Sequence, residues 1–84
     1  MEPEKKFATG AISATVWNNT AKTKSGEETS YRTVTLQRSY KDKNDAWQHT
    51  SSFRAADIPK AALVLTKAYE YLLLGREEEE EVVL

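Results

Sequence analysis

The sequence predicts an α+β fold in which an antiparallel sheet of three or four strands is followed by one C-terminal helix. Three observations support this. Residues 31–40, YRTVTLQRSY, alternate apolar and polar side chains with the period of two of a half-buried strand. Strand-like runs at 7–17 and 47–54 flank this segment. From Ile58 to Leu72, apolar residues recur at three- and four-residue spacing, which is typical of an amphipathic helix.

The first strand-like run, 7–17, has two interpretations because Gly10 lies inside it. Ile12, Ala14 and Val16 share one face by alternation. A glycine inside a strand often marks a bulge or a bend, so the run is either one bent strand or two short ones. The next residues, 18–30 (NNTAKTKSGEETS), are almost entirely polar and include Ser25-Gly26, which predicts a loop.

The last predicted strand, 47–54, follows a polar connection at 41–46. A hairpin at this connection would bring Tyr40 near Trp47 as a cross-strand aromatic pair. The pattern of this strand is less regular, because the face of Trp47 and Phe53 also carries His49 and Ser51. A bulge or an edge position would explain the irregularity.

The helix is expected to begin at Asp57, whose carboxylate can accept hydrogen bonds from first-turn amides, and to end near Gly75. Pro59 is compatible with the first turn. The predicted buried stripe comprises Ile58, Ala61, Ala62, Leu65, Ala68, Tyr69 and Leu72. Three consecutive leucines, Leu72, Leu73 and Leu74, extend the apolar surface beyond one stripe. A chain of 84 residues has a small core, so we expect a homodimer with these leucines at its interface.

Charge divides the chain unevenly although the net charge is only −1. Residues 1–56 carry nine Lys and Arg against six Asp and Glu, a net +3, whereas residues 57–84 carry three against seven, a net −4. This distribution is compatible with a nucleic-acid partner for the N-terminal part. We expect one domain over residues 1–75 and an acidic tail over residues 76–84.

The face of the sheet opposite Val34 and Leu36 is the candidate binding surface. By alternation it holds Ser13, Thr15, Trp17, Tyr31, Thr33, Thr35, Gln37, Gln48, Thr50, Ser52 and Arg54. Exposed rings stack unpaired bases, while hydroxyls, amides and cations hold the sugar-phosphate backbone. The predicted roles are stacking by Trp17 and Tyr31, backbone or base-edge contacts by Thr15, Thr33, Thr35 and Gln37, and phosphate contacts by Lys22, Lys24 and Arg54.

The sequence therefore predicts a non-catalytic protein that binds single-stranded nucleic acid, with single-stranded DNA favoured. Threonine-rich faces are also ordinary on solvated strands, and the two rings could instead lie in a dimer interface or under the 18–30 loop. The alternative function is a protein–protein interaction or adaptor module that binds no nucleic acid. Steep weakening of the complex by salt would indicate phosphate contacts and separate the two.

Three segments carry a resemblance to known proteins: GAISATVWNN, SYRTVTLQRSYKDKNDAWQHTSSFR and DIPKAALVLTKAYEYL. Together they resemble a group of small, mostly uncharacterised microbial proteins, some linked to plasmids and phages, and the segment from Arg38 to Phe53 is the most recognisable. The order of strands and helix is also similar in topology to single-stranded-DNA-binding coactivators of the positive-cofactor-four type and to plant Whirly proteins. That similarity implies a curved sheet and oligomerisation; no binding residue is carried over.

The chain ends in GREEEEEVVL. This ending is similar in plan to the acidic, hydrophobically tipped tails of bacterial single-stranded-DNA-binding proteins, which implies a possible protein partner at the tail. The acidic run could also compete with nucleic acid for the basic half, or simply be solvated. A further alternative is that the helix continues, with Val82 and Leu84 packing on a dimer mate.

The residue types disfavour catalysis and metal binding. His49 is the only histidine, cysteine is absent, and the three glycines form no phosphate-binding loop, so we predict no enzyme activity, metal or cofactor. No run approaches the ~20 apolar residues of a membrane span. The N-terminal residues MEPEKKFATG lack the apolar centre of a signal peptide, so we expect a cytoplasmic protein without a membrane partner.

Overall fold

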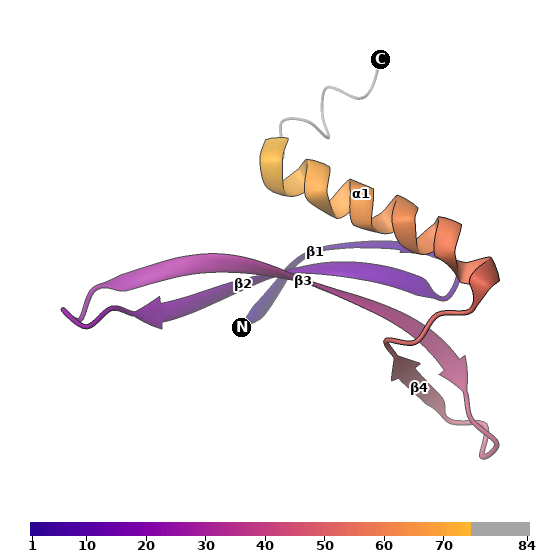
Figure 1. The fold of residues 1–84 in the computed structure, drawn as a ribbon. Coiled ribbons are helices and arrows are strands. Elements are labelled where there is room, and N and C mark those ends of the chain that lie inside the picture. Colours follow the sequence, from indigo (N-terminus) through magenta and orange to yellow (C-terminus); the bar gives the residue numbers. More distant parts are fainter. Residues whose placement is uncertain (75–84) are drawn as a thin grey trace.

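The computed structural model describes residues 1–74, which form one antiparallel sheet and a helix packed against it (Figure 1). The elements are β1 (Glu2–Thr9), β2 (Ile12–Lys22), β3 (Glu28–Lys41), β4 (Trp47–Thr50), the 3₁₀ helix η1 (Ala55–Asp57) and α1 (Ile58–Leu74). The strands are hydrogen-bonded in the order β1-β2-β3-β4. The predicted α+β class is confirmed, and the sheet has four strands. The acidic tail, 76–84, and the expected helix end at Gly75 lie outside the described residues.

The run around Gly10 is two strands, not one bent strand. Thr9 pairs with Ile12, so Gly10 and Ala11 form a two-residue turn between β1 and β2. Gly10 has φ +59, a conformation that glycine adopts without the steric cost other residues meet. The first strand also begins at Glu2 and not near Phe7, because its polar N-terminal half pairs with β2 as far as Asn18.

The loop predicted over residues 18–30 is wrong. β2 and β3 stay paired out to Lys22 and Glu28, and they form a hairpin arm that extends away from α1 (Figure 1). The turn is confined to residues 23–27, where the Thr23 amide donates to the Glu27 carbonyl at 2.8 Å. The arm extends past the helix, so neither of its faces packs against the apolar core. Its polar composition, which predicted a loop, is therefore compatible with a strand.

The core lies between α1 and one face of the sheet. Its buried apolar residues are Ile12, Ala14, Val16, Ala61, Val64, Ala68 and Tyr71. Phe7, Val34, Leu36, Phe53 and Leu72 are partly buried against this cluster. The predicted inward positions on β2 and β3 are therefore confirmed, with β2 contributing the fully buried ones.

The helix is rotated relative to the predicted stripe. Ala61 and Ala68 are buried as expected, but Val64 and Tyr71 take the inward positions. Ile58, Ala62, Leu65 and Tyr69 are exposed, and they form a second apolar stripe along the helix. The two stripes lie about 110° apart at 100° per residue, so periodicity alone could not choose between them.

Tyr71 can be buried because its hydroxyl has a charged partner. It donates to Oε2 of Glu4 at 2.6 Å, and Glu4 also accepts from Nε of Arg32 at 3.2 Å. Register shifts between Pro3 and Lys5, so a bulge in β1 brings both Glu4 and Lys5 toward the helix side. This network links β1, β3 and α1 where the arm leaves the core.

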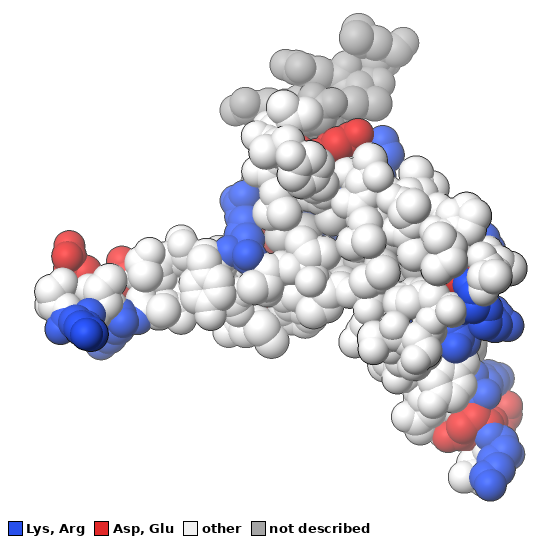
Figure 2. Space-filling view, viewed as in Figure 1, with Lys and Arg blue, Asp and Glu red and all other residues white. Residues whose placement is uncertain are grey.

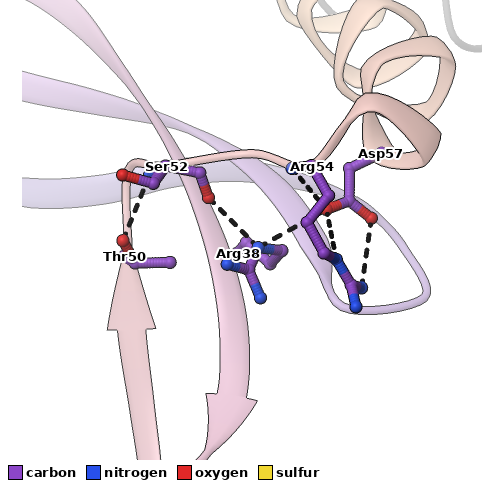
Figure 3. A network of polar contacts seen from close by, with 5 residues as sticks. All are labelled: Arg38, Thr50, Ser52, Arg54 and Asp57. Atoms are coloured by element: carbon purple, nitrogen blue, oxygen red, sulfur yellow. Dashed lines mark hydrogen bonds and ion pairs between the residues drawn. The ribbon is translucent and has the colours of Figure 1, made fainter.

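Asp57 does not cap α1 in the way the sequence predicted. Its carboxylate binds residues that precede it, accepting the Arg54 amide at 3.0 Å and Arg54 Nε at 3.1 Å (Figure 3). Nε of Arg38 on β3 lies 3.5 Å from Oδ2 of Asp57 and donates to the Ser52 carbonyl at 3.1 Å. The buried carboxylate thereby links the segment after β4 to β3. The hydrogen bonds from Arg54 lower the pKa of Asp57.

β4 is shorter than predicted, ending at Thr50 and not at Arg54. Its register pairs Lys41 with Trp47 and Tyr40 with Gln48, so the expected Tyr40–Trp47 pair is wrong. No helix within residues 1–74 is long and apolar enough to cross a membrane.

Candidate nucleic-acid interface

The face of the sheet turned away from α1, here called the open face, follows from the pairing of the strands. The residues of β2 that alternate with Ile12, Ala14 and Val16 belong to it, as do the residues of β1 and β3 paired with them and the residues of β4 paired with the same face of β3. They are Pro3, Lys6, Ala8, Ser13, Thr15, Trp17, Asn19, Ala21, Thr29, Tyr31, Thr33, Thr35, Gln37, Ser39, Lys41, Trp47 and His49. The structure thus brings Thr15, Trp17, Tyr31, Thr33, Thr35 and Gln37 to one face, as the alternation predicted. Their binding roles stay predictions.

Hydrogen bonds within the open face orient its central residues. Trp17 is partly buried, and its indole N–H donates to Oγ1 of Thr35 at 2.8 Å. Asn19 is buried, and its amide donates to Oγ1 of Thr33 at 3.1 Å. Tyr31 remains 52% exposed. The indole is therefore held in one orientation, while the tyrosine ring is accessible from solvent.

The β4 side of the open face carries Trp47 and His49 in place of the predicted Gln48 and Thr50. Ser39 pairs with His49 and Lys41 with Trp47, which sets the odd-numbered residues of β4 on the open face. Trp47 is 64% exposed, and the Nζ of Lys41 lies 5.4 Å from its ring centroid. Nδ1 of His49 lies 3.2 Å from Oγ of Ser39. Sequence reasoning missed both residues as site candidates.

The turn between β3 and β4 contains the signal that could have found them. Oδ1 of Asp42 accepts hydrogen bonds from the backbone amides of Asn44 at 2.8 Å and Ala46 at 3.0 Å. Oδ2 accepts one from the side-chain amide of Gln48 at 3.1 Å. Aspartate commonly closes a turn this way, and a turn over 42–46 requires Lys41 to face Trp47. Hydrogen bonds from the Ala46 backbone amide, the Gln48 side chain and the Asn44 backbone amide, in that order of effect, lower the pKa of Asp42.

The predicted phosphate-binding cations do not gather on the open face. Lys24 lies in the turn of the arm. Lys22, at the end of β2, lies on the face opposite the open face by alternation. Arg54 lies beyond β4 and is paired with Asp57, so its expected place on the open face is wrong. Figure 2 shows basic and acidic side chains together at the arm tip and at the β3–β4 turn. The cations that belong to the open face itself are Lys6 and Lys41.

Two shallow cavities lie at the β4 end of the sheet. The first, of about 370 Å³, is lined by Gly10, Ala11, Ser39 and Trp47. The second, of about 380 Å³, is lined by Thr35, Leu36, Gln37, His49, Thr50 and Ser51. Ser39 lines one and His49 the other, and these two residues are hydrogen-bonded to each other.

Comparison with other proteins adds no assignment: no protein-family model, curated protein or solved structure matches the chain. Within residues 1–74 there is no group of three or more His, Asp or Glu side chains that could hold a metal ion. The chemistry of the open face itself, with rings, hydroxyls, amides and two lysines, is the basis for a functional hypothesis.

Proposed function

We propose that the open face binds single-stranded nucleic acid, with single-stranded DNA favoured, and that it does so without catalysis. The observation that carries the proposal is the row of three aromatic residues, Tyr31, Trp17 and Trp47, on one uncovered sheet face. Each stacked base contributes ~1–3 kcal/mol in complexes of this kind. A single strand is favoured over a duplex because the faces of paired bases are already stacked on their neighbours.

The polar residues between the rings fit the same ligand. Thr33, Thr35 and Gln37 lie on β3 between Tyr31 and Lys41, a path of roughly 33 Å at ~3.3 Å per residue. Hydroxyl and amide groups can contact sugars, phosphates and base edges along this path. Lys6 and Lys41 supply positive charge beside it, and Lys22 and Lys24 add charge at the arm tip.

The test is fluorescence anisotropy of labelled single-stranded and duplex oligonucleotides at low and high salt. The full chain should bind the single strand more tightly, and salt should weaken the complex. The double substitution Trp17→Ala/Tyr31→Ala and the single substitution Trp47→Ala should each lower the affinity about tenfold or more. Tyr40→Ala is the matched control, because Tyr40 is an exposed aromatic residue of β3 on the face opposite the open face.

Removal of residues 77–84 completes this experiment. Stronger binding by the truncated chain would identify the acidic tail as a competitor of nucleic acid. Absence of binding at low salt by both chains would refute the nucleic-acid proposal and favour a protein-interaction module.

We also infer that two copies associate through the exposed stripe of α1, defined as Ile58, Ala62, Leu65, Tyr69 and Leu73. Ile58 is 54%, Tyr69 61% and Leu73 63% exposed. The spacing from 58 to 69 alternates four and three residues, the pattern by which two helices pair. The sequence predicted Leu72, Leu73 and Leu74 at the interface, but only Leu73 belongs to this stripe. Leu72 packs partly against the core of the same copy, and Leu74 lies on the other side of the helix.

Light scattering after size-exclusion chromatography tests this second proposal. The full chain should have twice the mass of one copy, and Leu65→Glu should reduce it to that of a monomer. Leu63→Glu is the control, since Leu63 is an exposed leucine of the same helix outside the stripe. A monomeric full chain, or equal effects of the two substitutions, would contradict it.

A further inference from the structure

We propose that the cavity at the end of β4 accepts one unpaired base of the bound strand, and that Gln37 and His49 contact its polar edge. This inference rests on the proposed function and adds the residues that choose among bases. It concerns a different part of the open face from the stacking positions Trp17 and Tyr31.

The cavity arises where β4 stops. β3 is paired with β4 only from Arg38 to Lys41, and β4 ends at Thr50. Beyond this point the chain leaves the sheet toward η1, held by the bond from Arg38 to the Ser52 carbonyl (Figure 3). The space that remains, about 380 Å³, is bounded by Thr35 and Gln37 on one side and by His49 and Ser51 on the other.

The cavity is large enough for one base. At about 380 Å³ it has room for roughly a dozen water molecules at ~30 Å³ each, which is more than a single base occupies. Thr35, Gln37 and His49 of its lining belong to the open face, whereas Leu36 and Thr50 belong to the helix side. A strand lying along the open face of β3 therefore meets three of the lining residues.

The lining favours a base over a phosphate. All six lining residues, Thr35, Leu36, Gln37, His49, Thr50 and Ser51, lack a permanent charge. A phosphate would require cations or several converging amides, whereas a neutral heteroaromatic ring needs flat apolar walls and a few donors and acceptors. Hydroxyl, amide and imidazole groups provide donors and acceptors here.

Two side chains are placed to select among bases. The Gln37 amide is exposed and makes no hydrogen bond to any residue in the 1–74 range, so both its donor and its acceptor are available. The bond between Nδ1 of His49 and Oγ of Ser39 orients the imidazole and leaves Nε2 for a ligand. A Gln amide recognises a base by pairing with adjacent donor and acceptor groups on its edge.

The neighbouring cavity supports a continuous path. Trp47 and Ser39 line it, and Ser39 is hydrogen-bonded to His49, which lines the proposed base site. Consecutive open-face residues on β3 are about 6.7 Å apart, at two residues per step. Trp47 is paired with Lys41, two such steps from Gln37, so a base stacked on Trp47 and a base in the cavity beside Gln37 would be about 13 Å apart, with room for one nucleotide between them.

The experiment measures the affinity of the full chain for four labelled 15-mers, each made of a single deoxynucleotide. The chain should prefer one of the four by about tenfold. Gln37→Ala and His49→Ala should remove that preference while leaving salt-sensitive binding. Trp17→Ala should lower all four affinities and keep the preference. Ser30→Ala is the matched control, because Ser30 lies on β3 with the alternation opposite to Gln37.

A second readout does not depend on substitutions. His49 is the single histidine of the chain, so its ring signals in a proton–carbon NMR spectrum are identified without assignment work. They should shift when the preferred 15-mer is added, and shift less with the others. Equal affinities for all four, or unchanged histidine signals on binding, would overturn the base site and leave the proposed function standing. No binding of any oligonucleotide would refute the proposed function itself.

Discussion

The indole N–H of Trp17 donates to Oγ1 of Thr35 at 2.8 Å, joining two side chains of β2 and β3 on the open face. Trp17 is paired directly with Thr33, so this bond runs diagonally to the next residue of the same face. It ties the ring to the strand that carries Tyr31 and Gln37. The orientation of the proposed stacking ring is thus set by a residue eighteen positions away.

The first prediction concerns this bond. Thr35→Val removes the acceptor but keeps the β-branched shape, so the fold should change little in stability, by about 1 kcal/mol or less. The indole is then free to adopt other rotamers, and we expect the affinity for single-stranded DNA to fall several-fold. Anisotropy titration together with the emission maximum of the tryptophans checks this. Thr20→Val, on the opposite alternation of the arm, is the control, and an affinity loss of the same size there would contradict the prediction.

The second prediction tests the rotation of α1. Val64 is 2% exposed and Leu65 is 39% exposed, although the sequence pattern favoured Leu65 as the buried residue. Val64→Ala removes two buried methyl groups and should cost about 1.5–3 kcal/mol of unfolding free energy. Leu65→Ala should cost less in the unfolding of one copy and instead weaken association of copies. Urea denaturation at several protein concentrations separates the two effects, and the reverse order of costs would show that the predicted stripe is the buried one.

The third prediction concerns the contact of Tyr71 with Glu4. Tyr71→Phe removes a 2.6 Å hydrogen bond from a buried hydroxyl to a carboxylate and keeps the ring, which packs edge-on against Phe7. We expect a loss of about 1–2 kcal/mol, since hydrogen bonds to charged groups are stronger than neutral ones. Tyr69→Phe on the exposed side of the same helix should have almost no effect. Chemical denaturation of the two variants measures the difference, and equal stabilities would contradict the network.

The fourth prediction is a pH dependence. The pKa of Asp57 is lowered in the folded protein, chiefly by the hydrogen bond from the Arg54 side chain. A depressed carboxylate pKa contributes stability above the unfolded value of ~3.9 and loses it as the pH falls through the folded value. Asp57→Asn should therefore lower the melting temperature at neutral pH, and the difference from the natural chain should shrink below pH ~4.

Asp45→Asn is the control for this measurement, because Asp45 is an exposed aspartate whose carboxylate lies 3.4 Å from Nζ of Lys41. It should lower the melting temperature less than Asp57→Asn at neutral pH. A difference for Asp57→Asn that stays constant down to low pH would show that the carboxylate charge does not stabilise the segment between β4 and α1.

The alternation of β3 and the apolar spacing of the helix were enough to predict the α+β class and the face shared by Trp17, Tyr31, Thr33 and Thr35. Both follow from local geometry, since alternate residues of a strand point to opposite faces. The arm was missed because its residues are polar on both faces, so its sequence shows no alternation of apolar and polar residues. The positions of Trp47 and His49 on the open face were not predicted, because they depend on the length of the turn between β3 and β4.

The amino-acid sequence by itself determined which segments are strands or helix wherever one side of the segment meets the core, because burial imposes a period on the residues. Tertiary structure alone decided which of two apolar stripes on α1 is buried, where β4 ends, and that Arg54 binds Asp57 on the helix side of the sheet. These features depend on partners distant in the chain, such as Glu4 for Tyr71 and Arg38 for Asp57. Such pairings are selected by how the layers pack, and no short run of residues contains that information.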